Sequence, residues 1–286
     1  MSWDWADKIA QRLSSQDLMQ KGICLILGAS DTGKTTLTMS LAKQLACRQP
    51  IGIVDADIGQ SHIGPPTTVG WAVVDKPPLD FSKLAVSGIS FVGHVTPVGH
   101  LLQLTAAIVQ GVQQLSKVTE LIIIDTPGLI RGPAAAALWW AVQQILKPRL
   151  ILAVQQGDEL SGILSGLRSF DLQLERIESP PQIAIKSPQE RQSYRKSQFV
   201  SYFRDAGLYN ISLSDIAVQP GRNLTGESFI NRLVALRNQK GIDMALGLIT
   251  GWQQGGKVMV VKAPPLDINQ ICCLVIGDIT IDITGQ

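Results

Sequence analysis

The sequence is poor in the features that mark secreted, zinc-clipped or membrane-spanning chains. Its four cysteines, Cys24, Cys47, Cys272 and Cys273, show no paired C-x-x-C spacing, which argues against a zinc site and a disulfide framework. No apolar run approaches the roughly 20 residues of a membrane helix. The start, "MSWDWADKIAQRL", lacks the basic and apolar stretches of a signal peptide. We therefore expect a cytoplasmic protein with reduced thiols and no membrane partner.

A large charge of either sign is also absent. The formal net charge is +2, which does not indicate a polyanionic partner. Any contacts with nucleic acid therefore have to come from local basic patches. With 286 residues, the chain is long enough for one large domain, or for a main domain with a small appendage, that folds without covalent staples.

Strands and helices alternate through most of the chain, a pattern typical of a mainly parallel sheet flanked by helices. Apolar runs predict strands at residues 23–28, 51–54, 88–93, 120–125 and 149–154, and helices at residues 34–46, 99–115 and 134–146. Near residue 207 the texture changes to short alternating stretches broken by "QQGG" and "APP". We therefore expect a main domain at residues 1–206 and a small β-rich domain at 207–286 that stabilises it.

The segment "GASDTGKT", residues 28–35, matches the P-loop pattern G-x-x-x-x-G-K-[ST] between a predicted strand and a predicted helix. Its glycines let backbone N–H groups point at phosphate oxygens, Lys34 can bridge the β and γ phosphates, and Thr35 can ligate Mg2+. A chance glycine turn rarely has both flanking elements. The predicted fold class is α/β, a P-loop NTPase with a small β-rich C-terminal domain. The candidate nucleotide-binding residues are Gly28, Ser30, Asp31, Thr32, Gly33, Lys34, Thr35 and Thr36.

Two further predicted strands end in carboxylates, at Asp55 and Asp125. Ligands of such sheets sit at the carboxyl ends of the strands, so both acids are expected near the phosphates. Asp125 opens "DTPG" and is a candidate Walker B residue, although a turn acid that caps the next helix is the alternative. Asp57 lies two residues after Asp55, and such residues face one side of extended backbone. One would orient metal waters and the other accept a proton from an attacking hydroxyl. The candidate metal ligands are Thr35, Asp55 and Asp125.

Signatures of two common P-loop classes are missing. A Ras-type GTPase needs a downstream N-K-x-D guanine reader, and "AIKSPQE" has the lysine without the following aspartate. A MinD-like ATPase has an additional lysine early in the P-loop, where this chain has Ala29 and Ser30.

The chain resembles instead the Clp1/Grc3/Nol9 family of polynucleotide 5'-hydroxyl kinases. The motifs that carry the resemblance are "GASDTGKT", "DADIGQS" with Pro65 and Pro66 behind it, "FVGHVTPVGHLL", "DTPGLIRG", "LKPRLILAVQQGDEL" and "RQSYR". They follow the family's order from about residue 23 to residue 203. The resemblance implies that the γ-phosphate of ATP is transferred, with Mg2+, to the 5'-hydroxyl end of RNA or DNA.

The same resemblance implies roles for the polar cluster after residue 54. Asp57 would be the general base on the 5'-hydroxyl, with Asp55 and Gln60 arranging metal and water, and the two aspartates could exchange roles. Outside this motif, Gln60 would be an ordinary loop amide with its hydrogen bonds satisfied.

A lid helix is expected at about residues 187–204. Ser187 stands where an N-cap belongs, Pro188 suits the first helical position, and Glu190 completes a capping box. Arg191 and Arg195 lie four apart, on one helical face, and on a mobile helix they could close over the phosphates and neutralise the charge of the transition state. The alternative is a solvated basic face, with Phe199 and Phe203 packed on the core.

The acceptor side is less defined. "HVTPVGH" matches a loop that the family places near the acceptor, so the candidate substrate contacts are Thr96, His100, Gln60 and Thr126. A lone histidine such as His100 is more often a helix-start or packing residue.

Aromatic stacking on the acceptor is in doubt. Trp139 and Trp140 suggest base stacking, but at least one of them has to face the core of its helix. Eukaryotic family members are expected to carry a tryptophan after the "TPG" element, where this chain has Leu129.

Two other functions compete with the polynucleotide kinase. A nucleotide-binding scaffold would keep Lys34 and Thr35 but would need neither a base nor paired lid arginines. A small-metabolite kinase would lack a basic track for a strand. The basic residues around the lid give modest support for such a track: Lys186, Arg191, Arg195, Lys196 and Arg204. The choice between RNA and DNA, and any protein partners, are not specified by the sequence.

Overall fold

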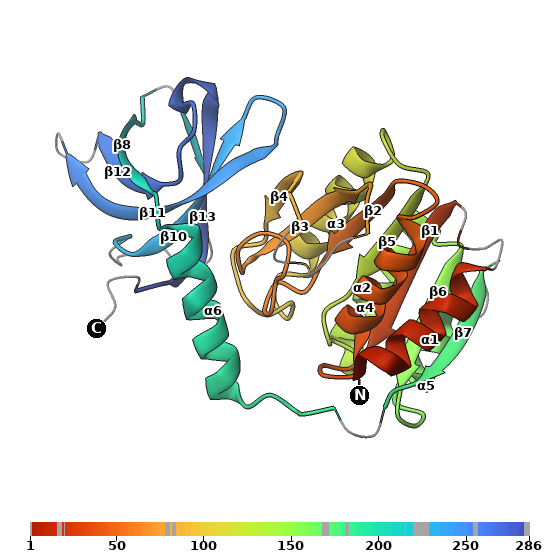
Figure 1. Cartoon of the computed structure of the whole chain (residues 1–286). Coiled ribbons are helices and arrows are strands. Elements are labelled where there is room, and N and C mark those ends of the chain that lie inside the picture. Colours follow the sequence, from red (N-terminus) through yellow and green to blue (C-terminus); the bar gives the residue numbers. More distant parts are fainter. Residues whose placement is uncertain are drawn as a thin grey trace.

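The computed structural model describes residues 2–15, 19, 21–77, 81, 84–167, 172–180, 183–214, 216–219, 229–253 and 257–282. Figure 1 shows a sheet with helices on both faces, a β-rich part at the C-terminal end of the chain, and one long helix beside the gap between the two. In the described part of the chain, no helix is both long and apolar enough to cross a bilayer.

Five parallel strands form the first half of the sheet. Their order is β7 (Gln173–Glu178), β6 (Leu150–Gln155), β1 (Gly22–Gly28), β5 (Leu121–Asp125) and β2 (Ile51–Asp55). A polar loop follows each of β1, β5 and β2. Because these strands are parallel neighbours, the three loops lie together at one edge of the sheet. The predicted α/β class, with a mainly parallel sheet in this part, is confirmed.

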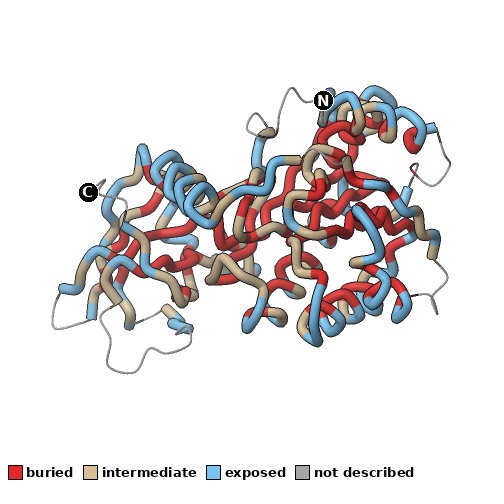
Figure 2. Tube along the Cα trace, turned by 90° about the horizontal axis from the view of Figure 1, so that it is seen from below, coloured by how far each residue is buried: buried red, intermediate tan, exposed pale blue. Residues whose placement is uncertain are grey.

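Helices cover both faces of this sheet and bury two separate apolar cores. On one face, α3 (Leu101–Leu115), α4 (Gly132–Leu146) and α5 (Ser161–Leu167) bury Leu104, Leu138 and Leu164. On the other face lie α1 (Ser2–Ser14) and α2 (Lys34–Leu45). The predicted helix at residues 34–46 is confirmed by α2, in which Leu37, Leu41 and Leu45 lie on one side and are all buried. Figure 2 shows the buried residues concentrated along the strands and on the inner sides of the helices.

Two strands that follow β2 run antiparallel to their neighbours. β3 (Thr68–Val74) pairs with β2, and β4 (Gly88–Phe91) pairs with β3. The apolar run at residues 88–93 was predicted as a strand, and β4 confirms it, whereas β3, β7, α1 and α5 were not predicted. In β3, Gly70 weakens the strand signal, and it is needed because a Cβ there would lie 1.8 Å from the carbonyl oxygen of Ile63.

The C-terminal part is β-rich, as predicted. It contains β8 (Gly207–Ser212), β9 (Ala217–Gln219), β10 (Arg232–Asn238), β11 (Asp243–Gln253), β12 (Val258–Ala263) and β13 (Ile271–Thr280). These strands have their own apolar core, which includes Ile211, Val234, Ile249 and Leu274. A boundary near residue 207 stays a prediction, because the sheet itself does not end there.

One buried carboxylate joins the two parts of the sheet. Asp243 of β11 pairs with Ile89 of β4, and its Oδ2 accepts a hydrogen bond of 2.7 Å from the Phe91 N–H. Its Oδ1 accepts from Arg237 Nε, also at 2.7 Å. Asp243 is only 3% exposed, so the desolvated charge is paired and hydrogen-bonded on both sides. The sheet is therefore continuous through both parts of the chain.

The long helix of Figure 1 is α6 (Pro188–Tyr202). The predicted capping box is confirmed: Ser187 accepts from the Glu190 N–H, and the Glu190 carboxylate accepts from the Ser187 N–H. Phe199 and Phe203 at its other end are buried in a cluster with Leu233 and Leu246 of the C-terminal part. That half of α6 is packed on the β-rich part and on β4, whose Ile89 and Phe91 belong to the same cluster.

Candidate functional site

The P-loop connects β1 to α2 and has the strained, glycine-dependent geometry of a phosphate cradle. Gly33 has φ +93 and Asp31 has φ 57, both in the left-handed region. A Cβ on Gly28 would lie 2.5 Å from the carbonyl oxygen of Val154. A Cβ on Gly128, in the "DTPG" turn, would lie 2.1 Å from Ser30 Oγ. The P-loop is thus packed directly against the ends of β5 and β6.

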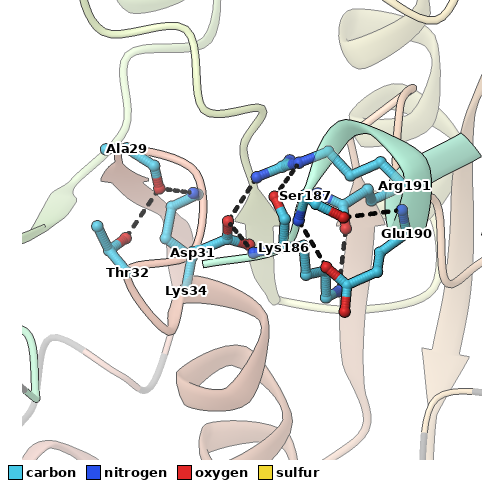
Figure 3. A network of polar contacts seen from close by, with 9 residues as sticks. Ala29, Asp31, Thr32, Lys34, Lys186, Ser187, Glu190 and Arg191 are labelled. Carbon is cyan, nitrogen blue, oxygen red and sulfur yellow. Dashed lines mark hydrogen bonds and ion pairs between the residues drawn. The ribbon is translucent and has the colours of Figure 1, made fainter. Parts of the chain in front are cut away.

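Lys34 is buried at the start of α2 with its ammonium group inside the P-loop. Lys34 Nζ donates a hydrogen bond of 2.6 Å to the carbonyl oxygen of Ala29, and Thr32 Oγ1 donates to the same oxygen at 2.9 Å (Figure 3). Burial lowers the pKa of Lys34, and the carboxylates of Asp125, Asp57 and Asp31 oppose that shift. The geometry places one desolvated positive charge where phosphate oxygens would enter.

Thr35 and Asp125 form the pair expected for a divalent cation. Thr35 Oγ1 donates to Asp125 Oδ2 at 2.7 Å. Asp125 Oδ1 is buried and, among the described residues, has no hydrogen-bond partner. Burial and, to a smaller extent, the nearby charge of Asp55 raise the pKa of Asp125 to about 7. The hydroxyl of Thr35 and the single carboxylate of Asp125 fit Mg2+, which takes most of its other ligands from water and phosphate. No cluster of three His, Cys, Asp or Glu side chains suited to a metal occurs in the described part of the chain.

The carboxylate of Asp55 is hydrogen-bonded to the backbone of the loop that follows β2. Its Oδ1 accepts from the Asp57 N–H at 3.1 Å, and its Oδ2 accepts from the N–H groups of His62 and Ile63 at 2.5 and 3.0 Å. The residue is 1% exposed, and burial raises its pKa to about 7. It therefore holds the loop after β2 in shape, and both of its carboxylate oxygens already accept from backbone N–H groups.

Asp57 takes a different position from Asp55, contrary to the expectation that both point to one side. β2 ends at Asp55, so the alternation of extended backbone no longer applies two residues later. Asp57 Oδ1 accepts from the N–H groups of Gly59 and Gln60, each at 3.1 Å, and the residue lines the cavity next to the P-loop. Of the two aspartates, the structure brings only Asp57 into the cavity.

The lid segment is fastened to both loops of the site. Arg191 donates to Asp31 Oδ2 at 2.5 Å, and the Lys186 N–H donates to the same oxygen at 3.2 Å (Figure 3). Lys186 Nζ donates to Gln60 Oε1 at 2.9 Å. Tyr194 OH donates to the carbonyl oxygen of Ser61 at 2.8 Å. Arg191 is therefore held at the P-loop by Asp31. Gln60 is linked to the same aspartate through Lys186, which contacts both.

A cavity of about 500 Å3 lies between the P-loop and the lid segment. Its size is in the range of small-ligand sites. The P-loop forms one wall, the loop after β2 a second, and α6 a third. The candidate residues that line it are Ser30, Asp31, Thr32, Gly33, Lys34, Thr35, Thr36, Asp57 and Gln60.

Sequence reasoning missed several aromatic residues of this cavity. His62, Tyr194, Phe81 and Trp3 also line it. The His62 ring lies 5.8 Å from both the Phe81 and the Tyr194 ring centres, and burial lowers its pKa. The signals available in the sequence were the position of His62 directly after "GQS" and of Tyr194 between the two lid arginines. Nothing in the sequence linked Trp3 to the P-loop, because the contact depends on how α1 packs.

Comparison with known proteins identifies the family. The family model described as "mRNA cleavage and polyadenylation factor CLP1 P-loop" matches residues 28–205. The chain belongs to this family. The expected resemblance is thereby confirmed.

Among the curated relatives of this CLP1 family member are two archaeal proteins named polyribonucleotide 5'-hydroxyl-kinase. The one from Pyrococcus abyssi is 31% identical over 213 residues, which are 74% of this chain and 59% of that protein. The one from Pyrococcus furiosus is 30% identical over 255 residues, which are 86% of this chain and 68% of that protein. The chain thus spans about three fifths of the length of the first relative.

A solved structure of wild-type Clp1p in complex with Pcf11p has the same fold. It superposes with a TM-score of 0.69 at 12% sequence identity, covering 96% of this chain and 77% of that chain. At this identity the match supports the fold alone. It covers the P-loop part and the β-rich part together.

Several predicted acceptor contacts of this CLP1 family member lie elsewhere. Thr126 is buried and donates to the carbonyl oxygen of Ile26 at 2.6 Å, which ties β5 to β1. His100 occupies the N-cap position of α3 without a side-chain cap hydrogen bond, which agrees with the helix-start alternative, and its Nε2 lies 3.0 Å from Asp278 Oδ2 of β13. Its ring stacks on His94, whose Nδ1 accepts from the Thr96 N–H. His94, His100 and Asp278 thus form a contact between the two parts of the chain.

The tryptophan pair is not at the P-loop either. Trp139 is fully buried, and its Nε1 donates to the carbonyl oxygen of Leu129 at 2.8 Å. Trp140 is half-exposed and borders a shallow groove between α4 and α5. The doubt about base stacking by this pair is therefore supported by their positions.

Proposed function

We propose that the chain is an ATP-dependent polynucleotide 5'-hydroxyl kinase that phosphorylates the 5' end of RNA. The observation that carries the proposal is that Asp57 lines the same cavity as Lys34 and Thr35. A P-loop that only binds or hydrolyses a nucleotide needs one metal carboxylate, which Asp125 supplies. Asp57 is an additional carboxylate within reach of the phosphates. RNA is chosen over DNA because the relatives are named for polyribonucleotides.

In the proposed reaction, the backbone N–H groups of the P-loop and Lys34 bind the triphosphate of ATP. Thr35 and Asp125 would hold Mg2+, which would supply neutralisation of the negative charge of the triphosphate when bound. Phosphoryl transfer needs positioning and charge stabilisation more than covalent chemistry, and this site offers both.

Asp57 accepts the proton of the attacking 5'-hydroxyl in this proposal. The hydroxyl oxygen forms a bond to the γ-phosphorus, the bond from that phosphorus to the β,γ-bridging oxygen breaks, and ADP leaves. Two N–H donors already fix Asp57 Oδ1, so the carboxylate is oriented before the acceptor arrives. Asp55 positions the loop that carries Asp57. Gln60 accepts a hydrogen bond from Lys186 and so helps to hold the lid segment. The exchange of roles between the two aspartates is thus disfavoured by geometry.

Arg191 is the lid arginine that acts on the nucleotide in this proposal. Its guanidinium is held at the P-loop by Asp31, and it would contact the γ-phosphate once ATP is bound. The charge that spreads over the phosphoryl oxygens in the transition state would then be shared between Lys34 and Arg191.

The test is transfer of labelled phosphate. The protein is incubated with Mg2+, γ-labelled ATP and short oligonucleotides, RNA and DNA, single and double stranded, with 5'-hydroxyl ends. We expect label on the 5' ends of RNA, and none on the same oligonucleotide carrying a 5'-phosphate or with the Lys34→Ala variant. If protein that binds ATP labels no oligonucleotide, the proposal is overturned in favour of a nucleotide-binding scaffold. Label on small hydroxylated metabolites in a parallel reaction, with none on any oligonucleotide, would show a kinase of another class.

A further inference from the structure

Trp3 is a large exposed side chain on the wall of the cavity between the P-loop and the lid segment, and the proposed reaction gives it no role. It lies in the first turn of α1 and is 47% exposed, with the Lys43 ammonium group of α2 at 4.5 Å from the ring centre. Trp5 in the same turn has a structural contact: its Nε1 donates a hydrogen bond of 3.0 Å to the carbonyl oxygen of Glu178, the last residue of β7. The turn that carries Trp3 is therefore attached to the sheet.

The order of the strands decides on which side of the P-loop this turn lies. β1, which leads into the P-loop, has β5 and then β2 on one side, and β6 and then β7 on the other. Asp125 ends β5 and Asp57 follows β2, so the metal pair and the proposed base lie on the β5 side. Ile183 follows β7, and a Cβ on Gly33 would lie 3.1 Å from both the Ile183 side chain and the Trp5 ring. The start of α1 thus adjoins the β6 side of the P-loop.

A triphosphate in this P-loop has a preferred direction. Its γ-phosphate has to lie on the side of Asp57 for transfer, so its α-phosphate, ribose and base extend toward the β6 side. The cavity is lined there and along α2 by Trp3, Ile183, Ala184, Thr36 and Met39. The other aromatic rings of the cavity, those of His62, Phe81 and Tyr194, adjoin the loop after β2 and so lie on the side of Asp57. The base would therefore lie next to Trp3.

We propose that Trp3 of α1 stacks on the base of the bound nucleotide, with Ile183 and Ala184 adding apolar surface. This inference rests on the proposed function, which sets the direction of the nucleotide. An indole ring offers a large flat surface at a low cost in conformational entropy, and stacking on such a ring is a common way to bind a base. The contact between Trp3 and Lys43 is a cation–π contact at an exposed site, which is weak, so a base can replace it.

The experiment separates contact with the base from contact with the phosphates. Calorimetric titration of the full chain measures the affinity for ATP and for inorganic tripolyphosphate, both with Mg2+. Trp3→Ala is expected to weaken ATP binding roughly 5- to 150-fold, the loss that corresponds to one base–aromatic stack, and to leave tripolyphosphate binding unchanged. Trp3→Phe keeps an aromatic ring and is expected to recover most of the affinity for ATP.

Trp140→Ala is the matched control. Trp140 is 50% exposed on α4 and borders the groove between α4 and α5, away from the P-loop. Its replacement is expected to change neither affinity. Intrinsic fluorescence gives an independent measurement: ATP should quench the emission of the wild type, less that of Trp3→Phe, and that of Trp140→Phe as much as the wild type.

The two proposals fail in different ways. Wild-type protein that labels no oligonucleotide overturns the proposed function, whereas the binding experiment on Trp3 needs no transfer. Trp3→Ala that binds ATP as tightly as the wild type, with full quenching retained in Trp3→Phe, overturns the stacking alone. An equal loss for ATP and tripolyphosphate also overturns it, because it would show a disturbed P-loop and no contact with the base.

Discussion

The carboxylate of Asp31 and the guanidinium of Arg191 form an ion pair with a separation of 2.5 Å that joins the P-loop to α6. The two side chains are only 7% and 24% exposed, so solvent screens the pair weakly. At the far end of α6, Phe199 and Phe203 are buried against the β-rich part. The helix is therefore fixed to both parts of the chain, and a motion that opens the nucleotide cavity has to break the ion pair or carry the β-rich part with it.

The first prediction concerns this ion pair. Asp31→Ala and Arg191→Ala should each lower kcat/KM, and the double variant should lose less than the sum of the two, with a coupling of about 0.5 to 3 kcal/mol. A double-mutant cycle on phosphate transfer measures it. Arg204→Ala, at an exposed arginine just beyond α6, is the control. Strictly additive losses would show that Asp31 and Arg191 act independently.

The second prediction separates the two aspartates. Asp57→Asn should lower kcat roughly 10²- to 10⁴-fold, because a general base is lost, while ATP binding and the melting temperature stay close to those of the wild type. Asp55→Asn should instead lower the free energy of unfolding by about 1 to 3 kcal/mol, because an amide cannot accept from three N–H groups as a carboxylate does. Kinetics and chemical denaturation on both variants test this. Normal transfer by Asp57→Asn would contradict the assignment.

The third prediction concerns the start of α6. Ser187→Ala removes the acceptor for the Glu190 N–H and should lower the free energy of unfolding by about 1 kcal/mol. Thermal denaturation measures the loss. Ser193→Ala, at an exposed serine inside the same helix, is the matched control and should be neutral. An equal loss in both variants would mean that the cap contributes nothing specific.

The fourth prediction concerns the metal. Chelation of Mg2+ should abolish transfer and remove most of the thermal stabilisation that ADP gives, which is about 2.7 kcal/mol at a ligand concentration of 100 Kd. Asp125→Asn should shift the Mg2+ dependence of both readouts to higher concentration, because the buried Oδ1 of Asp125 has no hydrogen-bond partner in the described part of the chain. Full stabilisation by ADP with a chelator present would argue against Thr35 and Asp125 as the metal pair.

Local patterns in the sequence were sufficient for the nucleotide end of the site. The P-loop between a strand and a helix, the carboxylates after β2 and β5, and the capping box before α6 are short motifs whose geometry depends on neighbouring residues. β7 and β3 were not predicted, because their local sequence does not carry a clear strand pattern. β7 carries polar residues along its length, and β3 contains a glycine that only its contact with Ile63 explains.

The tertiary structure decided the questions that depend on contacts between distant segments. The sequence by itself determined that a P-loop, two strand-end carboxylates and a capped basic helix are present. Only the fold decided that Asp55 is consumed by three N–H groups while Asp57 reaches the cavity, and that Arg191 binds Asp31 while Arg195 faces a separate groove. The physical reason differs between the two cases. Arg191 and Asp31 are 160 residues apart, so their distance is set by the packing of α6 across both parts of the chain. The N–H partners of Asp55 follow it within the next eight residues, but only the folded shape of that loop turns them toward its carboxylate.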